Sequence, residues 1–266
     1  MSLIVKICGL STRETLDVAL QAGADMVGFV FFPPSPRHIS LGTARELGRQ
    51  AKGRALKVAL MVDADDATLA NIVEALQPDM LQLHGKETVA RLRDIRQSFG
   101  LPVMKALPVE IAADLAPLPF YAAVADRILF DARAPKHATR PGGLGAVFDW
   151  HVLENLDLKL PFMVSGGLNA GNVAEAVRVT RAGGVDVSSG VESTLGIKDP
   201  DMIRAFIRAA HAVNDVMPGL VPGIHVSRNT SKQDVDGRDI GERSDAVLRT
   251  AMPGHDDLGF NPGGTR

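Results

Sequence analysis

The sequence contains a single cysteine, Cys8, among its 266 residues. One cysteine excludes an intramolecular disulfide and any metal site built from several thiolates. The sequence also lacks an apolar run near the roughly 20 residues that a membrane-spanning helix needs, and the apolar run at its N-terminus is too short for a signal peptide. These absences predict a protein of the reducing cytoplasm that has no membrane partner.

Neither sign of charge dominates the sequence. The 29 Lys and Arg residues nearly balance the 31 Asp and Glu residues, and the formal net charge is −2. This balance gives no general attraction to nucleic acid, so we expect no nucleic-acid partner, and an anionic ligand must be held by local contacts. The Walker and dinucleotide glycine patterns are absent, and no His, Cys, Asp or Glu spacing suits a metal. We therefore expect neither a cofactor nor a metal ion.

Apolar and amphipathic segments alternate regularly along the chain, 45% of which is apolar. Continuously apolar runs, typical of strands buried on both faces, lie at residues 4–9, 26–32, 56–62, 80–85, 103–107, 127–131, 162–167 and 185–190. Helix-like segments follow them at residues 12–22, 41–51, 66–76, 86–98, 110–118, 148–156, 170–181 and 200–214. Eight such units predict a single α/β domain, a (β/α)8 TIM barrel over residues 1–215. An open doubly wound sheet is the alternative.

The alternation stops near Val216. Residues 216–266 are rich in Gly, Pro, Asp and Arg and show no helical or strand periodicity. This composition predicts a disordered C-terminal extension. The segment resembles tails that arise when a bacterial reading frame runs on into a repeated genomic element, which would have no function. A partner-binding tail is the alternative.

The C-terminal ends of barrel strands meet on one face, where the active sites of this architecture lie. The first strand ends with Lys6 and Cys8, which share a face at the strand period of two and are expected to point into the barrel. A nearby ammonium favours the thiolate, so we expect the pKa of Cys8 to fall from about 8.5 towards neutrality and make Cys8 usable as a base. A small buried hydrophobic residue is the alternative interpretation.

Three other polar side chains stand at or after strand ends. Asp131 ends the sixth strand, on the far side of the barrel, and is expected either to cap the next loop or to act as a general acid. Arg37 follows the second strand in a proline-stiffened loop, where its guanidinium suits a two-pronged contact with a substrate carboxylate or is a solvated surface group. His84 ends the fourth strand, either as a ligand contact or as a hydrogen-bonded rim residue.

Glycine-rich turns follow the last three strands, with GGLG at residues 142–145, SGG at 165–167 and DVSSG at 186–190. Glycine lets backbone N–H groups approach an anion, and barrels commonly hold phosphate in the loops after strands seven and eight. We therefore expect a phosphate site at these turns. The candidate residues in these turns are Gly143, Gly145, Gly166, Gly167, Asp186, Ser188 and Ser189.

Seven motifs resemble those of the phosphoribosylanthranilate isomerase family of tryptophan biosynthesis. They are KICGL, GFVFFPPSPRHIS, LQLHG, LFD, PGGLGAVFDW, SGGLNAGNV and VDVSSGVESTLGIKD. They occur in the family's order over residues 3–214, which leaves out only the C-terminal extension.

The resemblance implies an Amadori rearrangement of N-(5-phosphoribosyl)anthranilate, a phosphorylated small molecule, to 1-(2-carboxyphenylamino)-1-deoxyribulose 5-phosphate. It places the general base on Cys8, the general acid on Asp131 and the carboxylate-binding arginine on Arg37. The phosphate and ribose contacts fall on the glycine and serine turns. No cofactor is implied, and both a monomer and a homodimer fit. Leu144 departs from the family pattern, since many relatives have a small polar residue there, and residues 132–141 form a longer loop than in compact relatives.

Other phosphate-binding barrels are alternatives at this stage. A ribulose-phosphate epimerase would use acidic pairs and a metal, and an indole-glycerol-phosphate synthase relies on lysines and a glutamate at strand ends. A non-catalytic barrel that only binds a phosphosugar is the alternative from another class. It predicts loss of the acid or the base, yet Cys8 and Asp131 are both present.

Overall fold

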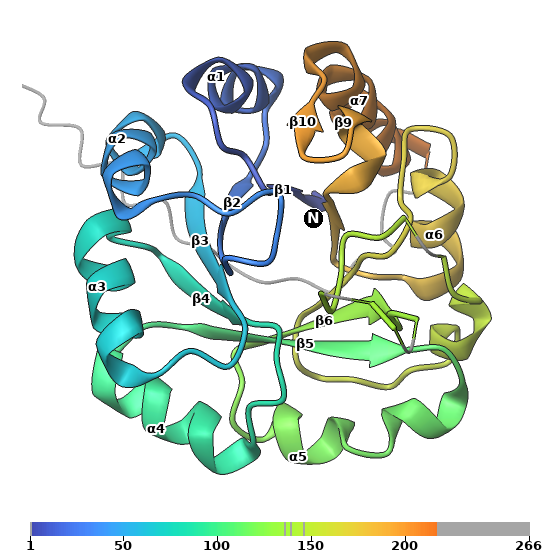
Figure 1. Cartoon of the computed structure of the whole chain (residues 1–266). Helices are drawn as coiled ribbons and strands as arrows, with labels where there is room; N and C mark the ends of the chain where they lie inside the picture. Colours follow the sequence, from blue (N-terminus) through green and yellow to red (C-terminus); the bar gives the residue numbers. More distant parts are fainter. Residues whose placement is uncertain (1, 136, 139, 146, 217–266) are drawn as a thin grey trace, which may run out of the picture. The chain divides into compact units, whose positions relative to one another are not determined.

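The computed structural model describes residues 2–135, 137–138, 140–145 and 147–216. Eight parallel strands close into a barrel (Figure 1). The first and last strands pair directly, with Val5 opposite Val185, so the predicted barrel is confirmed and the open sheet is wrong. Apart from Val216, the expected C-terminal extension lies outside the described residues.

The strands of the barrel are β1 (Ile4–Cys8), β2 (Met26–Phe31), β3 (Leu56–Met61), β4 (Met80–Leu83), β5 (Val103–Val109), β6 (Arg127–Ala132), β7 (Phe162–Val164) and β8 (Gly184–Val187).

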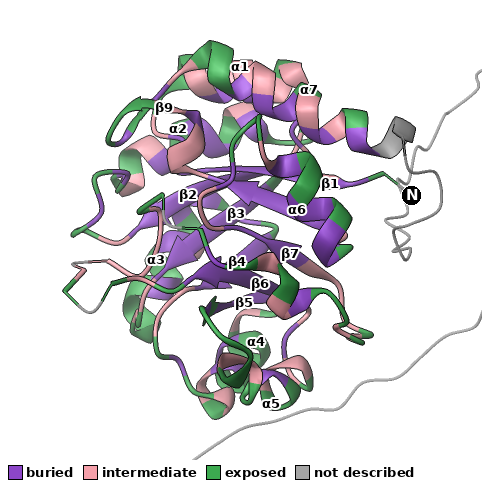
Figure 2. Cartoon of the chain, turned by 90° about the vertical axis from the view of Figure 1, so that its right-hand side faces the viewer, coloured by how far each residue is buried: buried purple, intermediate pink, exposed green. Residues whose placement is uncertain are grey.

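Helices surround the barrel and cover its outer face (Figures 1 and 2). The outward side chains of the strands pack against them in one large apolar core. The α-helices are α1 (Arg13–Ala22), α2 (Leu41–Ala51), α3 (Asp66–Leu76), α4 (Val89–Phe99), α5 (Leu118–Ala122), α6 (Val173–Thr180) and α7 (Pro200–Val216), and short 3-10 turns form η1 (Ala112–Leu115), η2 (Trp150–Leu153) and η3 (Ser189–Val191).

Two of the predicted helices are not continuous α-helices in the structure. Residues 110–118 contain η1 and then the start of α5, because Pro117 supplies no backbone N–H and interrupts the helical hydrogen bonds. Residues 148–156 contain only η2, in which Leu153 alone is buried. The segment still packs Phe148 and Leu153 into the core, so one short 3-10 turn is enough to bury its apolar side chains.

The inside of the barrel has an apolar layer and a polar layer. Nearer the C-terminal strand ends, the inward side chains are polar and buried, among them Lys6, Gln82, Asp131 and Asp186. This layer stands on a plug of apolar side chains, so the polar groups face the open C-terminal end of the barrel. The plug consists of Met26, Val58, Met80, Met104, Ala106, Leu129 and Met163.

The last two strands end earlier than predicted. β7 ends at Val164 and β8 at Val187, and the glycine-rich residues that follow form turns. Gly166 and Gly167 have φ angles of 86° and 61°, a left-handed conformation that a strand does not contain. After η3 the chain forms a small antiparallel hairpin that the sequence did not predict, β9 (Glu192–Thr194) and β10 (Ile197–Lys198).

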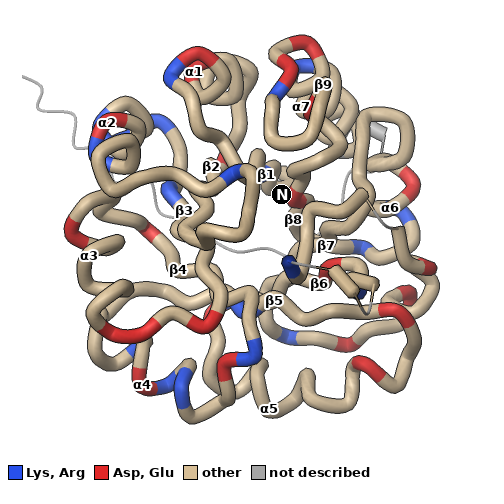
Figure 3. The backbone as a smooth tube through the Cα atoms, viewed as in Figure 1, with Lys and Arg blue, Asp and Glu red and all other residues tan. Residues whose placement is uncertain are grey.

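Charged residues of both signs are interspersed around the outer helices (Figure 3). The described surface therefore has the mixed character that the balanced composition predicts. No helix in the described part of the chain is long and apolar enough to cross a membrane.

Candidate active site

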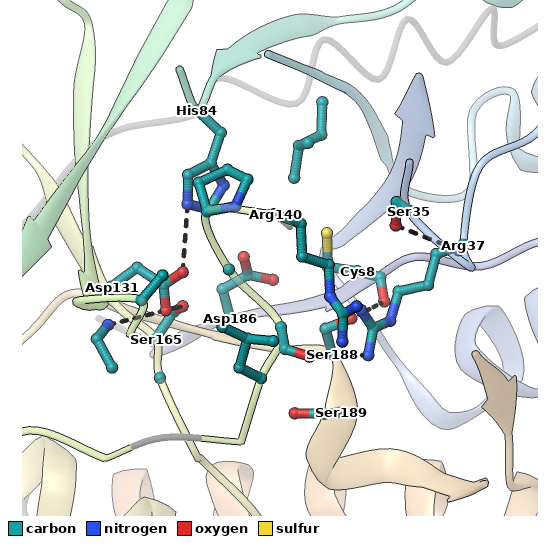
Figure 4. A pocket seen from close by; sticks show the side chains of 18 of the residues that line it. Cys8, Ser35, Arg37, His84, Asp131, Arg140, Ser165, Asp186, Ser188 and Ser189 are labelled. Atoms are coloured by element: carbon teal, nitrogen blue, oxygen red, sulfur yellow. Dashed lines mark hydrogen bonds and ion pairs between the residues drawn. The ribbon is translucent and has the colours of Figure 1, made fainter. Parts of the chain in front are cut away.

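The C-terminal ends of the strands surround a pocket of about 790 Å³, its open mouth included. Every residue that the sequence predicted for the site lines this pocket, and Figure 4 labels those among them that have side chains. Within the described ranges, no group of three or more His, Cys, Asp or Glu side chains is arranged to hold a metal ion. The lining includes Cys8, Arg37, His84, Asp131, Gly143, Gly145, Gly166, Gly167, Asp186, Ser188 and Ser189.

Cys8 lies at the end of β1 with Lys6 below it on the same inward face, as predicted. Both side chains are buried, and Lys6 Nζ lies 2.8 Å from Asp186 Oδ2 on the neighbouring strand β8. Gly28 stands opposite Cys8 on β2. A Cβ atom at Gly28 would lie 2.9 Å from Cys8 Sγ and 3.1 Å from Lys6 Nζ, so glycine at this position leaves the room that the thiol and the ammonium occupy.

The predicted fall in the pKa of Cys8 is wrong for this structure. Burial raises the pKa of the Cys8 thiol above its ordinary 9.0, and the negative charge of Asp186 adds to this effect. Lys6 and Lys198 favour the thiolate but do not outweigh burial. Lys6 contributes too little because its ammonium already pairs with Asp186. The free site therefore favours the neutral thiol at neutral pH.

Lys6 and Asp186 form a buried ion pair inside the barrel. Burial disfavours the ammonium, but the attraction of Asp186 outweighs it and raises the pKa of Lys6 above its ordinary 10.5. Asp186 Oδ1 is buried and has no hydrogen-bond partner in the described part of the chain. Since Asp186 lines the pocket, this oxygen can accept a hydrogen bond from a ligand hydroxyl.

Asp131, at the end of β6, is held in place by three neighbours. Its Oδ1 accepts hydrogen bonds from Ser165 Oγ at 2.6 Å and from the Ala132 N–H at 3.0 Å. Its Oδ2 lies 3.2 Å from His84 Nε2 (Figure 4). Gln82 Nε2 lies 3.5 Å from His84 Nδ1 on the other side of the ring. The carboxyl group is thus buried and held in one orientation, and it lines the pocket.

Arg37 is buried at the other side of the pocket and is not a solvated surface group. Its Nε and Nη2 atoms donate to the two carboxylate oxygens of Glu192 at 2.6 and 2.8 Å, and Nη2 also donates to the Gly143 carbonyl at 3.1 Å. The guanidinium edge best suited to a two-pronged contact is therefore engaged by Glu192.

Glu192 and Lys198, from the hairpin after η3, connect Arg37 to the turn after β8. Burial alone would raise the pKa of Glu192, but hydrogen bonding by Arg37 and the charge of Lys198 lower it to about 2. Burial lowers the pKa of Lys198 to about 8, against the attraction of Glu192. Lys198 Nζ also donates to the Ser188 carbonyl at 2.8 Å, and Ser188 Oγ donates to the Cys8 carbonyl at 3.1 Å.

The glycines of the GGLG turn serve two different neighbours. A Cβ atom at Gly142 would lie 2.5 Å from Asp131 Oδ2, and one at Gly143 would lie 2.5 Å from Arg37 Nη1. The first two glycines thus allow the loop to close over the acid and the arginine. Gly145 instead lies near Ser189, on the side of the turns after β7 and β8.

Comparison with known proteins identifies the family. A model described as N-(5'phosphoribosyl)anthranilate (PRA) isomerase matches residues 5–209, from β1 into α7. The chain belongs to this family. The resemblance drawn from the seven motifs is confirmed, and the match decides against the epimerase and synthase alternatives.

Known phosphoribosylanthranilate isomerases are similar over the whole barrel. The N-(5'-phosphoribosyl)anthranilate isomerase of Bradyrhizobium diazoefficiens is 79% identical over 215 residues, which cover 81% of this chain and 96% of the relative. The crystal structure of the Thermotoga maritima enzyme has a TM-score of 0.72 and 36% identity, covering 79% of this chain and 99% of that one. A phosphoribosylanthranilate isomerase in complex with reduced 1-(o-carboxyphenylamino)-1-deoxyribulose 5-phosphate has a TM-score of 0.69 and 34% identity over the same shares.

Sequence reasoning missed several polar residues of this phosphoribosylanthranilate isomerase pocket. Gln82 lines the pocket beside the predicted residues, and Ser165, expected only as part of the SGG turn, lines it as the partner of Asp131. The period of two that pairs Lys6 with Cys8 would also have found Gln82, two residues before His84. Glu192 and Arg140 had no such signal, because they lie beyond or between the eight strands.

Glu192 carries a prediction for stability. Its carboxyl has a pKa of about 2 in the folded chain against an ordinary 4.5, so the stability it provides is complete above 4.5 and is lost as the pH falls towards 2. We expect Glu192→Gln to be less stable at neutral pH, and about 2 kcal/mol of the difference to vanish over this window. Urea unfolding of both proteins across the pH range measures it.

The matched control is Glu175→Gln, which changes an exposed carboxylate paired with Arg178 on α6. Its stability difference should stay small at every pH. A Glu192→Gln difference that does not change between neutral pH and pH 2 would show that the carboxylate is not held in its charged form by Arg37 and Lys198.

Proposed function

We propose that this member of the phosphoribosylanthranilate isomerase family performs its Amadori rearrangement with Cys8 as general base and Asp131 as general acid. The family catalyses the conversion of N-(5-phosphoribosyl)anthranilate to 1-(2-carboxyphenylamino)-1-deoxyribulose 5-phosphate in tryptophan biosynthesis. The observation that carries the residue roles is the presence of a thiol and an oriented carboxyl group on different sides of one pocket (Figure 4). An acid and a base placed apart can act on two atoms of one substrate.

The reaction begins at the furanose ring. Asp131 donates a proton to the ring oxygen as the C1′–O bond breaks, and the lone pair of the anthranilate nitrogen forms the C1′=N bond of a Schiff-base cation. Cys8 then removes the C2′ proton, and the electrons of that C–H bond neutralise the cation to give an enolamine. The enolamine gains a proton at C1′ and loses one from the C2′ hydroxyl, which yields the ketone. The substrate nitrogen is the electron sink, so these steps need no cofactor.

The raised pKa of Cys8 suits this order of steps. Burial disfavours the thiolate in the free site. A Schiff-base cation formed beside Cys8 favours the thiolate and also makes the C2′ proton more acidic. A larger fraction of Cys8 is therefore present as the thiolate when its target proton is ready to leave.

The substrate's two anionic ends fit two sides of the pocket. The turns after β7 and β8 present Gly166, Gly167, Ser188 and Ser189, which suit the phosphate. Asp186 carries negative charge and would repel the phosphate, so its unpaired oxygen better suits a ribose hydroxyl. The buried Arg37 suits the anthranilate carboxylate.

We further propose a cytoplasmic enzyme, monomeric or homodimeric, that acts on a phosphorylated small molecule without a nucleic-acid or membrane partner. A role in amino-acid biosynthesis supports the location. The Thermotoga maritima relative, described as a dimeric enzyme from which monomers were generated, supports leaving both oligomeric states in the proposal.

Genetic complementation tests the activity. A bacterial tryptophan auxotroph that lacks this isomerase should grow without tryptophan when it expresses the chain, and should not grow when it expresses Cys8→Ser at an equal level. Failure of the unchanged chain to restore growth, although it is expressed and folded, would contradict the proposed function. Growth with Cys8→Ser would contradict only the role given to Cys8.

A further inference from the structure

The guanidinium of Arg37 already has an anionic partner within the protein. Glu192 accepts two hydrogen bonds from it, and the Gly143 carbonyl accepts another. Glu192 is shared with Lys198, whose Nζ lies 2.7 Å from Glu192 Oε1. Arg37 therefore meets a substrate carboxylate with its charge largely balanced and with the Nε–Nη2 edge in use.

A second arginine faces the same part of the pocket. Arg140, in the loop after β6, lines the pocket, and its guanidinium lies beside that of Arg37 (Figure 4). Arg140 Nε is buried and has no hydrogen-bond partner among the residues that the structure describes, and no described carboxylate lies within 4.0 Å of the guanidinium. Burial and repulsion by Arg37 lower the pKa of Arg140 below its ordinary 12.5, whereas Glu192 opposes them.

The charges at this side of the pocket do not cancel. Arg37, Arg140 and Lys198 are positive, and among the described residues Glu192 is the one carboxylate that forms an ion pair with any of them. Two adjacent guanidinium groups and an ammonium group, with one carboxylate that pairs with Arg37 and Lys198 only, leave an excess of positive charge. Such an excess is costly in a partly buried site unless a ligand supplies an anion. The site is thus prepared for an anionic ligand.

We propose that Arg140 is a second carboxylate-binding residue, which clamps the anthranilate carboxylate of the substrate together with Arg37. This inference rests on the proposed function. Apolar side chains of Val30, Phe32 and Leu60 line the pocket near the strand that leads to Arg37, and they provide a surface for the aromatic ring that carries the carboxylate. Arg140 supplies a second positive charge and a buried Nε–H donor that has no partner among the described residues.

The phosphate is the other anion that Arg140 could bind. The backbone and serine donors for the phosphate come from the turns after β7 and β8, whereas the Arg140 guanidinium lies beside that of Arg37 (Figure 4). A ligand pair separates the two assignments. The reduced product analogue, 1-(2-carboxyphenylamino)-1-deoxyribitol 5-phosphate, contains both anions, and the matching phenylamino compound lacks the ring carboxylate but keeps the phosphate.

Calorimetric titration of the full chain with both compounds tests the inference. Arg140→Gln should bind the carboxylated compound about 10- to 100-fold more weakly, the usual effect of one charge-assisted contact, and should bind the phenylamino compound as the unchanged chain does. Arg140→Lys, which keeps the charge but not the planar fork, should fall between them. Arg178→Gln, an exposed change on α6, serves as the matched control and should change neither affinity.

Two results would overturn the assignment. Unchanged binding of both compounds by Arg140→Gln would show that Arg140 contacts neither anion. Equal weakening of both compounds would assign Arg140 to the phosphate or to the pocket's shape. If the unchanged chain bound neither compound, the proposed function itself would fail, which distinguishes that failure from one of Arg140 alone.

Discussion

Cys8→Ser should lower kcat by about 10²- to 10⁴-fold, the usual contribution of a general base. The serine hydroxyl fits the space of the thiol beside Gly28, but it is a far weaker acid and supplies almost no anion to remove the C2′ proton. Binding of the reduced product analogue should change little, because the expected phosphate and carboxylate contacts lie elsewhere in the pocket. Steady-state kinetics and calorimetry measure the two quantities.

The pH dependence of the unchanged chain provides the control for this role. Burial raises the pKa of the free thiol above 9.0, so kcat/KM, which reports the free enzyme, should still rise with pH in the alkaline range. The rise in kcat should occur at lower pH, because the Schiff-base cation stabilises the thiolate in the complex. Cys8 is the single thiol of the sequence, so the absorbance of the thiolate, minus that of Cys8→Ser, measures its titration directly. Ionisation of the free thiol near neutral pH would contradict the raised pKa.

Asp131→Asn should cause a loss of similar size, about 10²- to 10⁴-fold in kcat. The amide keeps the size and one carbonyl oxygen, which can still accept from Ser165 Oγ and the Ala132 N–H. It cannot supply the acidic proton that the ring oxygen needs, so ring opening slows. Steady-state kinetics measures the loss, and thermal unfolding checks that the fold is kept.

Ser165→Ala is the matched control for Asp131→Asn. It removes a group that orients the carboxyl without touching the substrate in the proposed reaction, so its loss of kcat should be clearly smaller. Near-normal turnover by Asp131→Asn would remove the role of general acid. An equal loss in both variants would instead mean that orientation of the carboxyl matters as much as its proton.

The architecture and the place of the site follow from local patterns in the sequence. Continuous apolar runs identify the strands because each is buried on both faces, and the closure of a parallel barrel brings their C-terminal ends together. One rule, that polar residues at these ends face the same opening, therefore places Cys8, His84, Asp131 and Asp186 around one pocket.

Long-range partners determine what the local patterns missed. Lys6 does lower the pKa of Cys8, but burial outweighs it, and Asp186, 180 residues away from Lys6 in the chain, pairs with Lys6 and raises the pKa of the thiol further. Arg37 was expected to have two guanidinium donors free for a substrate carboxylate. Glu192, in a hairpin 155 residues further along the chain, instead accepts hydrogen bonds from its Nε and Nη2 atoms. Both outcomes depend on which carboxylate lies next to a given cation once the barrel has closed. The periodicity of the sequence does not predict that pairing.

The order of the two proton transfers is tested most directly by trapping the ring-opened Schiff base. Each variant is mixed with substrate and quenched with borohydride, which reduces the Schiff base to a stable amine. Cys8→Ser should accumulate this amine well above an enzyme-free control, because Asp131 still opens the ring while the C2′ proton is not removed. Asp131→Asn should give no more than the control. Accumulation with Asp131→Asn and none with Cys8→Ser would contradict the assignment of Asp131 as the acid and Cys8 as the base.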